Sequence, residues 1–190
     1  MNIRSLLHLP AALRDSLLEM VYDNKLRQNL LEQNDGLSIR RGVEIRSPKL
    51  LVLGKGVIID SYVLLHCGGM DWSSGKGGIR IGDYSYIGPH SVLFGAGGIT
   101  IGSQVLISPG VIIASHEHTF ALDGLSMREQ PHEFSPVLIE DNVYIGANAT
   151  ILPGVTIETG TVIGAGAVVT KNLPARSLCL GVPAKMVRAL

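Results

Sequence analysis

The sequence predicts an all-β solenoid in which short parallel strands stack around one continuous core. The first observation is a six-residue repeat: from Ile139 the chain reads IEDNVY, IGANAT, ILPGVT, IETGTV, IGAGAV and VTKNLP. Earlier blocks, such as LGKGVI, IDSYVL, IGSQVL and ISPGVI, follow the same pattern. The second observation is composition: 46% of the residues are hydrophobic but only 5% are aromatic, which predicts a core of Val, Ile, Leu and Ala.

A period of six residues fits neither an amphipathic helix nor a simple alternating strand. It fits a prism in which each block forms one side and three blocks complete a coil of about 18 residues. The Ile or Val that begins each block points inward and stacks on its neighbours, while Gly relieves crowding at the corners. The alternative is a two-sheet sandwich with Gly-rich turns, which the constant phase of the repeat over so many blocks disfavours.

The repeat divides the chain into three parts. Residues 1–40 form an N-terminal helical cap, because apolar residues recur at three- and four-residue spacing between about residues 5 and 35. Pro10 marks a helix start there. Residues 41–175 form the β-helix, and residues 176–190 form a C-terminal tail.

Two stretches leave the repeat as loops. The first is HCGGMDWSSGKGG, residues 66–78, which is rich in Gly and Ser and carries the single tryptophan, Trp72. That side chain either packs the loop down or offers a platform to a substrate. The second is SHEHTFALDGLSMREQPHEFSP, residues 115–136, a long excursion from the coil.

Bulk properties exclude several classes of protein. The formal net charge is zero and no Lys/Arg run occurs, so we expect no nucleic-acid partner. No stretch of about 18 apolar residues occurs, so we expect no integral membrane association, and the N-terminus does not resemble a signal peptide. Cys67 and Cys179 are far apart and lack metal-ligand spacing. A reduced, cytoplasmic protein is therefore expected.

The last third of the chain, IEDNVYIGANATILPGVTIETGTVIGAGAVVTKNLPARSLCLGVPAKMVRAL, resembles the C-terminal half of the hexapeptide-repeat acyltransferases. Within them it is most similar to the maltose, galactoside, xenobiotic and cell-surface polysaccharide O-acetyltransferases. The marks are PV-x-I-x-D-N-V-aromatic-I-G, ILPGVTI, IGAGAVVTK and G-x-PAK-x-x-R. The repeat extends the similarity back to about Leu53. The resemblance implies that the β-helix is left-handed.

The resemblance also implies acetyl-CoA as co-substrate, with no metal required. It puts Ala147 and Ala165 beside the pantetheine arm, Thr170 and Lys171 at the nucleotide end, and two basic residues near the phosphates, Lys185 and Arg188. These residue types suit the ligand, because a thin thioester arm needs a smooth wall of small residues and phosphates need Lys or Arg. Taken singly, the same residues would read as solvated charges and a tight corner.

The stretch ASHEHTF begins the second loop, where this family carries a histidine that acts as general base. Imidazole suits the removal of a proton from an attacking hydroxyl or amine near neutral pH. A gapless count puts the family's histidine at His118, with His116 as an acceptor contact or second base. Spacing does not separate the two, because residues two apart on an extended segment share a face. The group orienting the base is open between a backbone carbonyl and the nearby carboxylates of Glu117, Asp123, Glu129 and Glu133.

The resemblance implies direct transfer from acetyl-CoA to a sugar or glycan in a ternary complex, as an O-acetyltransferase with N-acetylation as the variant. The expected pathway is cell-surface polysaccharide or lipopolysaccharide biosynthesis. Where relatives often have an acceptor-binding Asn, this chain has Gly88, and either Tyr86 or His90 would have to substitute. A homotrimer is expected, because the CoA groove needs a second prism and a heterologous three-fold ring closes the arrangement.

Two other functions compete with this one. A carbonic anhydrase-like metal enzyme of the same repeat needs three metal-binding histidines, with an H-x4-H pair within the coil, whereas this chain has H-x-H on a loop. A non-catalytic scaffold has no need of a GVPAK-x-x-R motif together with a loop histidine. We therefore favour the acetyltransferase.

Overall fold

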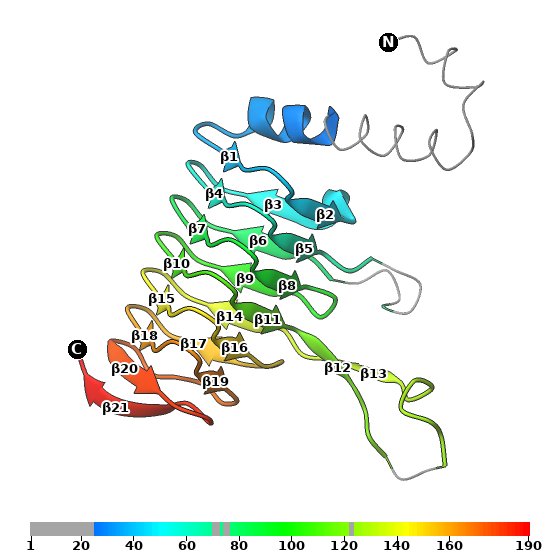
Figure 1. Cartoon of the computed structure of the whole chain (residues 1–190), viewed down its shortest axis with the longest axis vertical. Helices are drawn as coiled ribbons and strands as arrows, with labels where there is room; N and C mark the ends of the chain where they lie inside the picture. Colours follow the sequence, from blue (N-terminus) through cyan, green and yellow to red (C-terminus); the bar gives the residue numbers. More distant parts are fainter. Residues whose placement is uncertain (1–24, 70–72, 74–76, 122–123) are drawn as a thin grey trace.

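The structure, a computed structural model, describes residues 25–69, 73, 77–121 and 124–190. Pro10, Trp72 and Asp123 lie outside the described residues, so the interpretations attached to them are not addressed. Residues 25–33 form a helix at the N-terminal end of a triangular prism of stacked strands (Figure 1). Three parallel sheets make the three faces of the prism, which we call faces A, B and C.

The faces are defined by their strands, and one short 3₁₀ helix, η2 (Pro48–Leu50), precedes the first strand of face C. Face A contains β1 (Ser38–Ile39), β4 (Ile58–Ile59), β7 (Tyr86–Ile87), β10 (Leu106–Ile107), β15 (Tyr144–Ile145), β18 (Val162–Ile163), β20 (Ser177–Leu180) and β21 (Lys185–Ala189). Face B contains β2 (Glu44–Arg46), β5 (Leu64–His66), β8 (Val92–Phe94), β11 (Ile112–Ala114), β16 (Thr150–Ile151) and β19 (Val168–Val169). Face C contains β3 (Leu51–Leu53), β6 (Ile79–Ile81), β9 (Ile99–Ile101), β14 (Val137–Ile139) and β17 (Thr156–Ile157).

The core is a set of ladders in which the same inward position of each coil stacks on the next. Each pair of neighbouring strands within a face is parallel, except β20 and β21. On face A the buried ladder consists of Ile39, Ile59, Ile87, Ile107, Ile145, Ile163 and Cys179. The predicted β-helix of hexapeptide repeats with an aliphatic core is thereby confirmed. Cys67 and Cys179 are both free and buried.

The coils are not all of one length. In the last coils the stacked positions of face C, Ile139 and Ile157, are 18 residues apart, as the repeat predicts. Ile81 and Ile101 are 20 residues apart, because the turn from face B to face C is longer there. The turn from Leu93 to Ile101 includes Gly95, at which a Cβ would lie 2.6 Å from the Ile79 side chain. The extra residues thus pass close over the preceding coil.

Both ends of the prism are more regular than the sequence indicated. β1 continues face A within the range that we expected to form the helical cap. At the other end, β20 joins face A by pairing with β18, and β21 folds back antiparallel onto β20 (Figure 1, red). Among the described residues, no helix is long and apolar enough to cross a bilayer.

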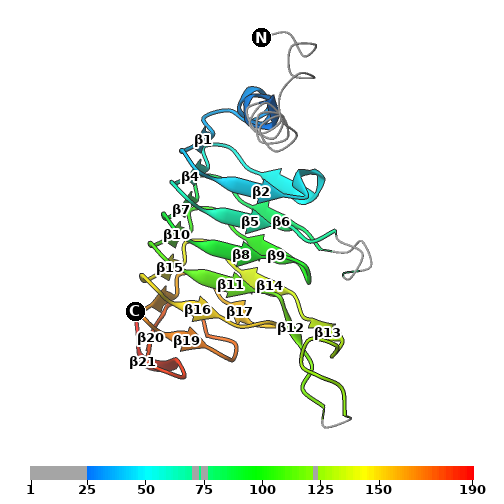
Figure 2. The ribbon, with the colours of Figure 1, turned by 45° about the vertical axis from the view of Figure 1, so that its right-hand side comes forward.

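The two predicted loops leave the prism at the same corner, between faces B and C. The first follows β5 and the second follows β11, and the described part of the second loop projects from the side of the prism (Figures 1 and 2). The second loop contains a hairpin of two antiparallel strands, β12 (His116–His118) and β13 (His132–Phe134). The stack of coils therefore presents this hairpin on a rigid support.

The stacked core makes a sharp prediction for stability. Ile101 is 1% exposed and packs inside the prism, whereas its neighbour Thr100 points outward and is exposed. Replacing Ile101 with Ala should lower the free energy of unfolding by about 2–5 kcal/mol, because it removes buried surface and leaves a cavity. The matched variant Thr100→Ala should change it by less than about 0.5 kcal/mol. Chemical denaturation measures both, and equal effects would contradict the inward ladder.

Candidate active site

The histidine-rich hairpin is built by cross-strand pairing. His116 lies opposite Phe134, Glu117 opposite Glu133, and His118 opposite His132. Successive side chains of a strand point to opposite faces, so the histidines and Phe134 share one face and the two glutamates share the other.

The root of the hairpin is tied into the prism by Ser115, which is fully buried. Its hydroxyl donates to the Phe94 carbonyl at 2.8 Å and accepts from the Gly97 amide at 2.9 Å. Its carbonyl accepts from the Ser135 amide at 2.9 Å, which closes the base of the loop. Gly97 must lack a side chain, because a Cβ there would overlap the Ser115 carbonyl. The hairpin therefore starts from a fixed position.

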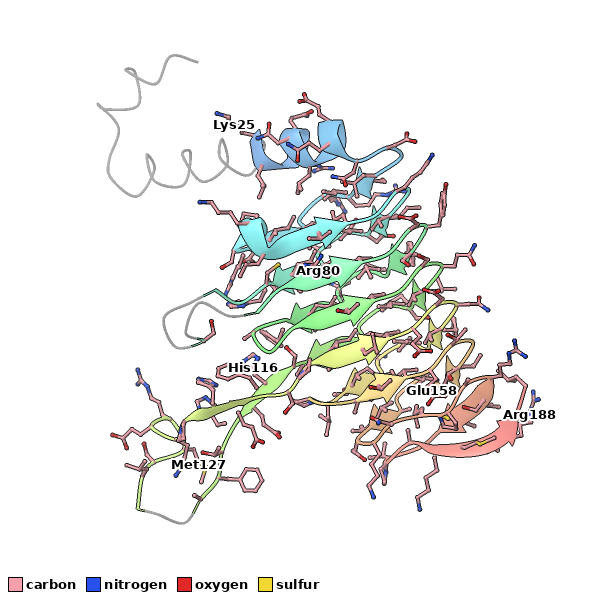
Figure 3. The ribbon with its side chains drawn as sticks, turned by 180° about the vertical axis from the view of Figure 1, so that it is seen from behind. Lys25, Arg80, His116, Met127, Glu158 and Arg188 are labelled. Carbon is pink, nitrogen blue, oxygen red and sulfur yellow. The ribbon has the colours of Figure 1, made fainter. Side chains whose placement is uncertain are left out.

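Aromatic rings run from the prism onto the hairpin. The His66 and Phe94 rings, on neighbouring strands of face B, are 6.3 Å apart between centroids. Phe94 then meets His116 edge-on at 6.1 Å, and His116 stacks on Phe134 at 6.1 Å. Figure 3 shows His116 where the hairpin leaves the prism, with Met127 far out along the loop. The inner end of the hairpin is thus packed against Phe94, at the end of strand β8 of face B.

His118 has a defined hydrogen bond. Its Nδ1 lies 3.0 Å from the carbonyl oxygen of Gln130. A carbonyl only accepts, so Nδ1 must carry the proton in this contact and Nε2 keeps its lone pair. Of the orienting groups that the sequence left open, the structure has the backbone carbonyl in this position. His118 itself is exposed, as a proton acceptor for a bound substrate needs to be.

Gln130 is rigidly held although it lies in a loop. It is 2% exposed, its amide group donates to the Ala121 carbonyl at 3.0 Å, and its Oε1 accepts from the Thr119 hydroxyl at 2.9 Å. The backbone of Thr119 also donates to the Pro131 carbonyl at 2.9 Å. These bonds cross the hairpin just beyond His118, so the carbonyl that orients the imidazole is itself fixed.

The electrostatics of the hairpin favour the neutral forms of His116 and His132. Burial lowers the pKa of His116, and the positive charges that His132, His66 and His118 can carry lower it further. Burial also lowers the pKa of His132, with a further contribution from His118. At neutral pH these two side chains are therefore uncharged. Among the residues that the structure describes, no group of three or more His, Cys, Asp or Glu side chains is arranged to hold a metal ion.

Ala147 and Ala165, expected along the pantetheine arm, are brought together by the fold. They occupy equivalent turns of adjacent coils at the corner between faces A and B, and the Gly166 amide donates to the Ala147 carbonyl at 2.8 Å. A Cβ at Gly146 would lie 2.5 Å from the Ala165 nitrogen, so these turns need small residues. The two turns therefore bring the Ala147 and Ala165 methyl groups onto one edge of the prism.

The expected nucleotide-binding residues lie in two other places. Thr170 and Lys171 follow β19 directly and are exposed at the corner between faces B and C, two coils below the root of the hairpin. Lys185 and Arg188 are exposed on β21, and Arg188 points outward at the far end of the molecule (Figure 3). Within one chain, then, the hairpin and the alanine turns lie on opposite edges of face B.

The two candidates for the acceptor contact have other partners. The Tyr86 hydroxyl donates to Asp60 at 2.7 Å, which lowers the pKa of the Asp60 carboxyl and raises that of Tyr86. The His90 ring stacks on Tyr62 at 5.2 Å between centroids. Tyr86 lies on face A, and His90 lies in the turn from face A to face B. Both are therefore away from the hairpin of the same chain.

Sequence reasoning missed the roles of Gln130 and His132. A signal was available, because HEH at residues 116–118 and HEF at residues 132–134 are near-identical triplets that can pair as antiparallel strands. The tie between Gln130 and His118 had no such signal, since it depends on a backbone carbonyl.

Comparison with known proteins agrees with this architecture. Residues 136–171 match the bacterial transferase hexapeptide (six repeats), and residues 78–115 match the hexapeptide repeat of succinyl-transferase. The two matched segments flank the hairpin. In fold, the chain is similar to AntD, an N-acyltransferase from Bacillus cereus whose structure contains dTDP and 3-hydroxybutyryl-CoA. That similarity has a TM-score of 0.73 and 25% identity, over 85% of this chain and 87% of AntD.

Two curated relatives are similar in sequence. The galactoside O-acetyltransferase of Escherichia coli is 39% identical over 93 residues, which are 48% of this chain and 44% of that enzyme. The chain thus spans less than half the length of this relative. The putative colanic acid biosynthesis acetyltransferase WcaF of Escherichia coli is 33% identical over 136 residues, which are 72% of this chain and 68% of WcaF. With the repeats, the fold and this extended similarity in agreement, the chain belongs to the hexapeptide-repeat acyltransferase family.

Proposed function

We propose that this protein transfers the acetyl group of acetyl-CoA to a hydroxyl group of a sugar or glycan, with an amine as the variant acceptor. The observation that carries the proposal is the His118 imidazole, fixed through Nδ1 on the Gln130 carbonyl at 3.0 Å and exposed on a hairpin anchored to the prism. The names of the relatives support it, since two are sugar-related acetyltransferases and AntD binds a CoA thioester together with dTDP.

In this mechanism His118 is the general base. As the acceptor oxygen attacks the thioester carbon, Nε2 of His118 takes the hydroxyl proton. The tetrahedral intermediate then collapses, the carbon–sulfur bond breaks, and the imidazolium returns the proton to the departing CoA sulfur. The Gln130 carbonyl accepts from Nδ1 throughout and stabilises the cationic ring.

Direct transfer, without an acyl-enzyme, fits the state of the cysteines. Burial raises the pKa of the Cys67 thiol to about 12, and both Cys67 and Cys179 are inside the prism core. A thiol that is neither ionised nor accessible is a poor nucleophile. His118 therefore acts on the acceptor itself. His116, which is more buried and packed between Phe94 and Phe134, serves as the acceptor contact or second base.

For the donor, we propose that the pantetheine arm runs along the edge formed by Ala147 and Ala165. Thr170 and Lys171 lie across face B from the alanine turns of their own chain, so they contact the nucleotide end of a CoA that lies along the alanine turns of a neighbouring copy. Lys185 and Arg188 are close to the phosphates. All four of these residues are exposed and therefore accessible to an anionic ligand. Lys and Arg bind phosphate through charge-assisted hydrogen bonds, which are about twice as strong as neutral ones.

The working unit is a homotrimer. The hairpin and the alanine turns occupy opposite edges of face B, so one chain does not combine both, whereas a neighbouring copy brings its hairpin to this chain's alanine turns. Outward apolar side chains support such contacts: Leu106 is 44% exposed, Ile112 41% and Tyr144 39%. Head-to-tail contacts close into a ring where the rotation between copies allows it, and we propose a ring of three copies.

The acceptor pathway is cell-surface polysaccharide or lipopolysaccharide biosynthesis. The name of WcaF, which refers to colanic acid, supports this pathway, and the dTDP in AntD supports an acceptor linked to a nucleotide. Two free cysteines are consistent with a cytoplasmic location, where acetyl-CoA is available.

The first test is a calorimetric titration with acetyl-CoA, which needs no knowledge of the acceptor. We expect saturable binding that Lys171→Ala weakens about tenfold, the cost of one charge-assisted hydrogen bond. His118→Ala should bind acetyl-CoA like the wild type, because its role is in proton transfer. Lys49→Ala, on η2 at the other end of the prism, is the matched charge control. No binding at millimolar acetyl-CoA would instead favour a non-catalytic scaffold.

The role of His118 is tested by acetyl transfer to a panel of sugars and nucleotide sugars. His118→Ala should lower kcat by about 10²- to 10⁴-fold, the usual contribution of a general base. Glu117→Gln, which lies between the two histidines but on the opposite face of the hairpin, should keep near-normal activity. A larger loss for His116→Ala than for His118→Ala would reverse the assignment of the base.

The trimer is tested by activity as a function of protein concentration. Specific activity should fall as dilution dissociates the trimer, because each site needs two chains. Analytical ultracentrifugation at the same concentrations gives the oligomeric state. Full specific activity from a verified monomer would disprove a site shared between copies.

A further inference from the structure

His132 is the side chain in closest ring contact with His118. The two residues are cross-strand partners, and their ring centroids are 4.0 Å apart with an interplanar angle of 39°. This separation is much shorter than the 5.6 Å between His116 and His132. The contact is therefore direct packing of one imidazole against another.

Further rings support His132 from the prism side. Its ring lies 6.0 Å from that of Phe134 and 5.6 Å from that of His116, which itself packs on Phe94. His132 is half-buried, while His118 is exposed. His118 therefore packs against the ring of His132, which the neighbouring rings of His116 and Phe134 hold in place.

Two different contacts therefore act on the same imidazole. The Gln130 carbonyl engages Nδ1 at one edge of the His118 ring, and His132 packs against the ring. A hydrogen bond to one nitrogen still allows the ring to tilt about that contact. Packing against a second ring removes much of this freedom, as required of a base that must meet the acceptor proton in one geometry.

We propose that His132 is a positioning residue for His118, packing against its ring across the β12–β13 hairpin so that Nδ1 stays on the Gln130 carbonyl and Nε2 stays available. The proposal rests on the proposed function for the role of His118 as base, but the positioning itself is a property of the resting protein.

The charge state of His132 is compatible with this role. Burial lowers its pKa, and the neighbouring His118 lowers it further, so His132 is neutral at neutral pH. A neutral neighbour adds no like charge when His118 becomes imidazolium during transfer. The other titratable groups near it are His116, on the same face of the hairpin, and His66, on strand β5 of the prism, whereas Glu117 and Glu133 share the opposite face of the hairpin.

The test compares three variants of the full-length protein by ¹⁵N NMR of the histidine rings, without any substrate. His132→Ala removes the packing, His132→Phe keeps a ring that cannot titrate, and Glu133→Gln changes the same strand on its other face. We expect the Nδ1-protonated form of His118 to dominate in the wild type, in His132→Phe and in Glu133→Gln. In His132→Ala the Nδ1-protonated form of His118 should no longer dominate the spectrum.

Activity gives the second readout. His132→Ala should lower kcat by about 10²-fold, the order of effect for a misplaced catalytic group, while KM for acetyl-CoA changes less than about twofold. His132→Phe should recover most of kcat, because it keeps a ring in contact with His118. Cross-strand amide contacts between Glu117 and Glu133 report whether the hairpin remains paired. If His132→Ala unpairs it, His132→Val, which favours a strand but has no ring to pack on His118, takes its place.

The proposal is overturned if the packing-deficient variant retains both the wild-type His118 spectrum and kcat. It is also overturned if His132→Phe is as impaired as that variant, since the ring contact would then not be what matters. Failure to find any acetyl transfer would count against the proposed function alone, because the spectra of the resting protein test the positioning independently.

Discussion

The stacking of like side chains inside the prism is the constraint from which the rest of the molecule follows. Each coil contributes inward aliphatic residues to every face, and these residues pack on their equivalents in the neighbouring coils. No coil buries its core alone, so the register of one coil is set by its neighbours. This register fixes where every corner lies, and hence where the chain can leave the prism.

The register of the coils also determines the positions of the hairpin and the alanine turns in the candidate site. The hairpin starts at Ser115, whose hydroxyl and backbone amide bind the adjacent coil, so its position is set by parallel stacking and not by the loop itself. The alanine turns depend on the same spacing, because adjacent coils bring Gly146 against the backbone of Ala165. A loop that carries the proposed base and a wall suited to a thin cofactor are thus both attached to one rigid lattice of strands.

The fold could be predicted from the sequence because its rule is local: one Ile or Val every six residues reports the inward position directly. The candidate histidines could be found for a similar reason, since they interrupt that rule immediately after a core position. The partners of His118 could not. The Gln130 contact uses a backbone carbonyl, which any residue provides, and the His132 contact depends on the register of a hairpin enclosed by a long loop. The boundaries of the β-helix at its two ends were also hard to predict, because β1 and β20 continue face A without a clear hexad.

The corner between faces B and C accepts segments of very different length while the core stays in register. Six positions separate Ile151 from Ile157, eight separate Leu93 from Ile101, 16 separate Leu65 from Ile81, and 26 separate Ile113 from Ile139. In each case the chain re-enters face C at the next rung. Changes in segment length at this corner can therefore remodel the surface around the hairpin while the core of the prism stays in register, so the two are free to evolve separately.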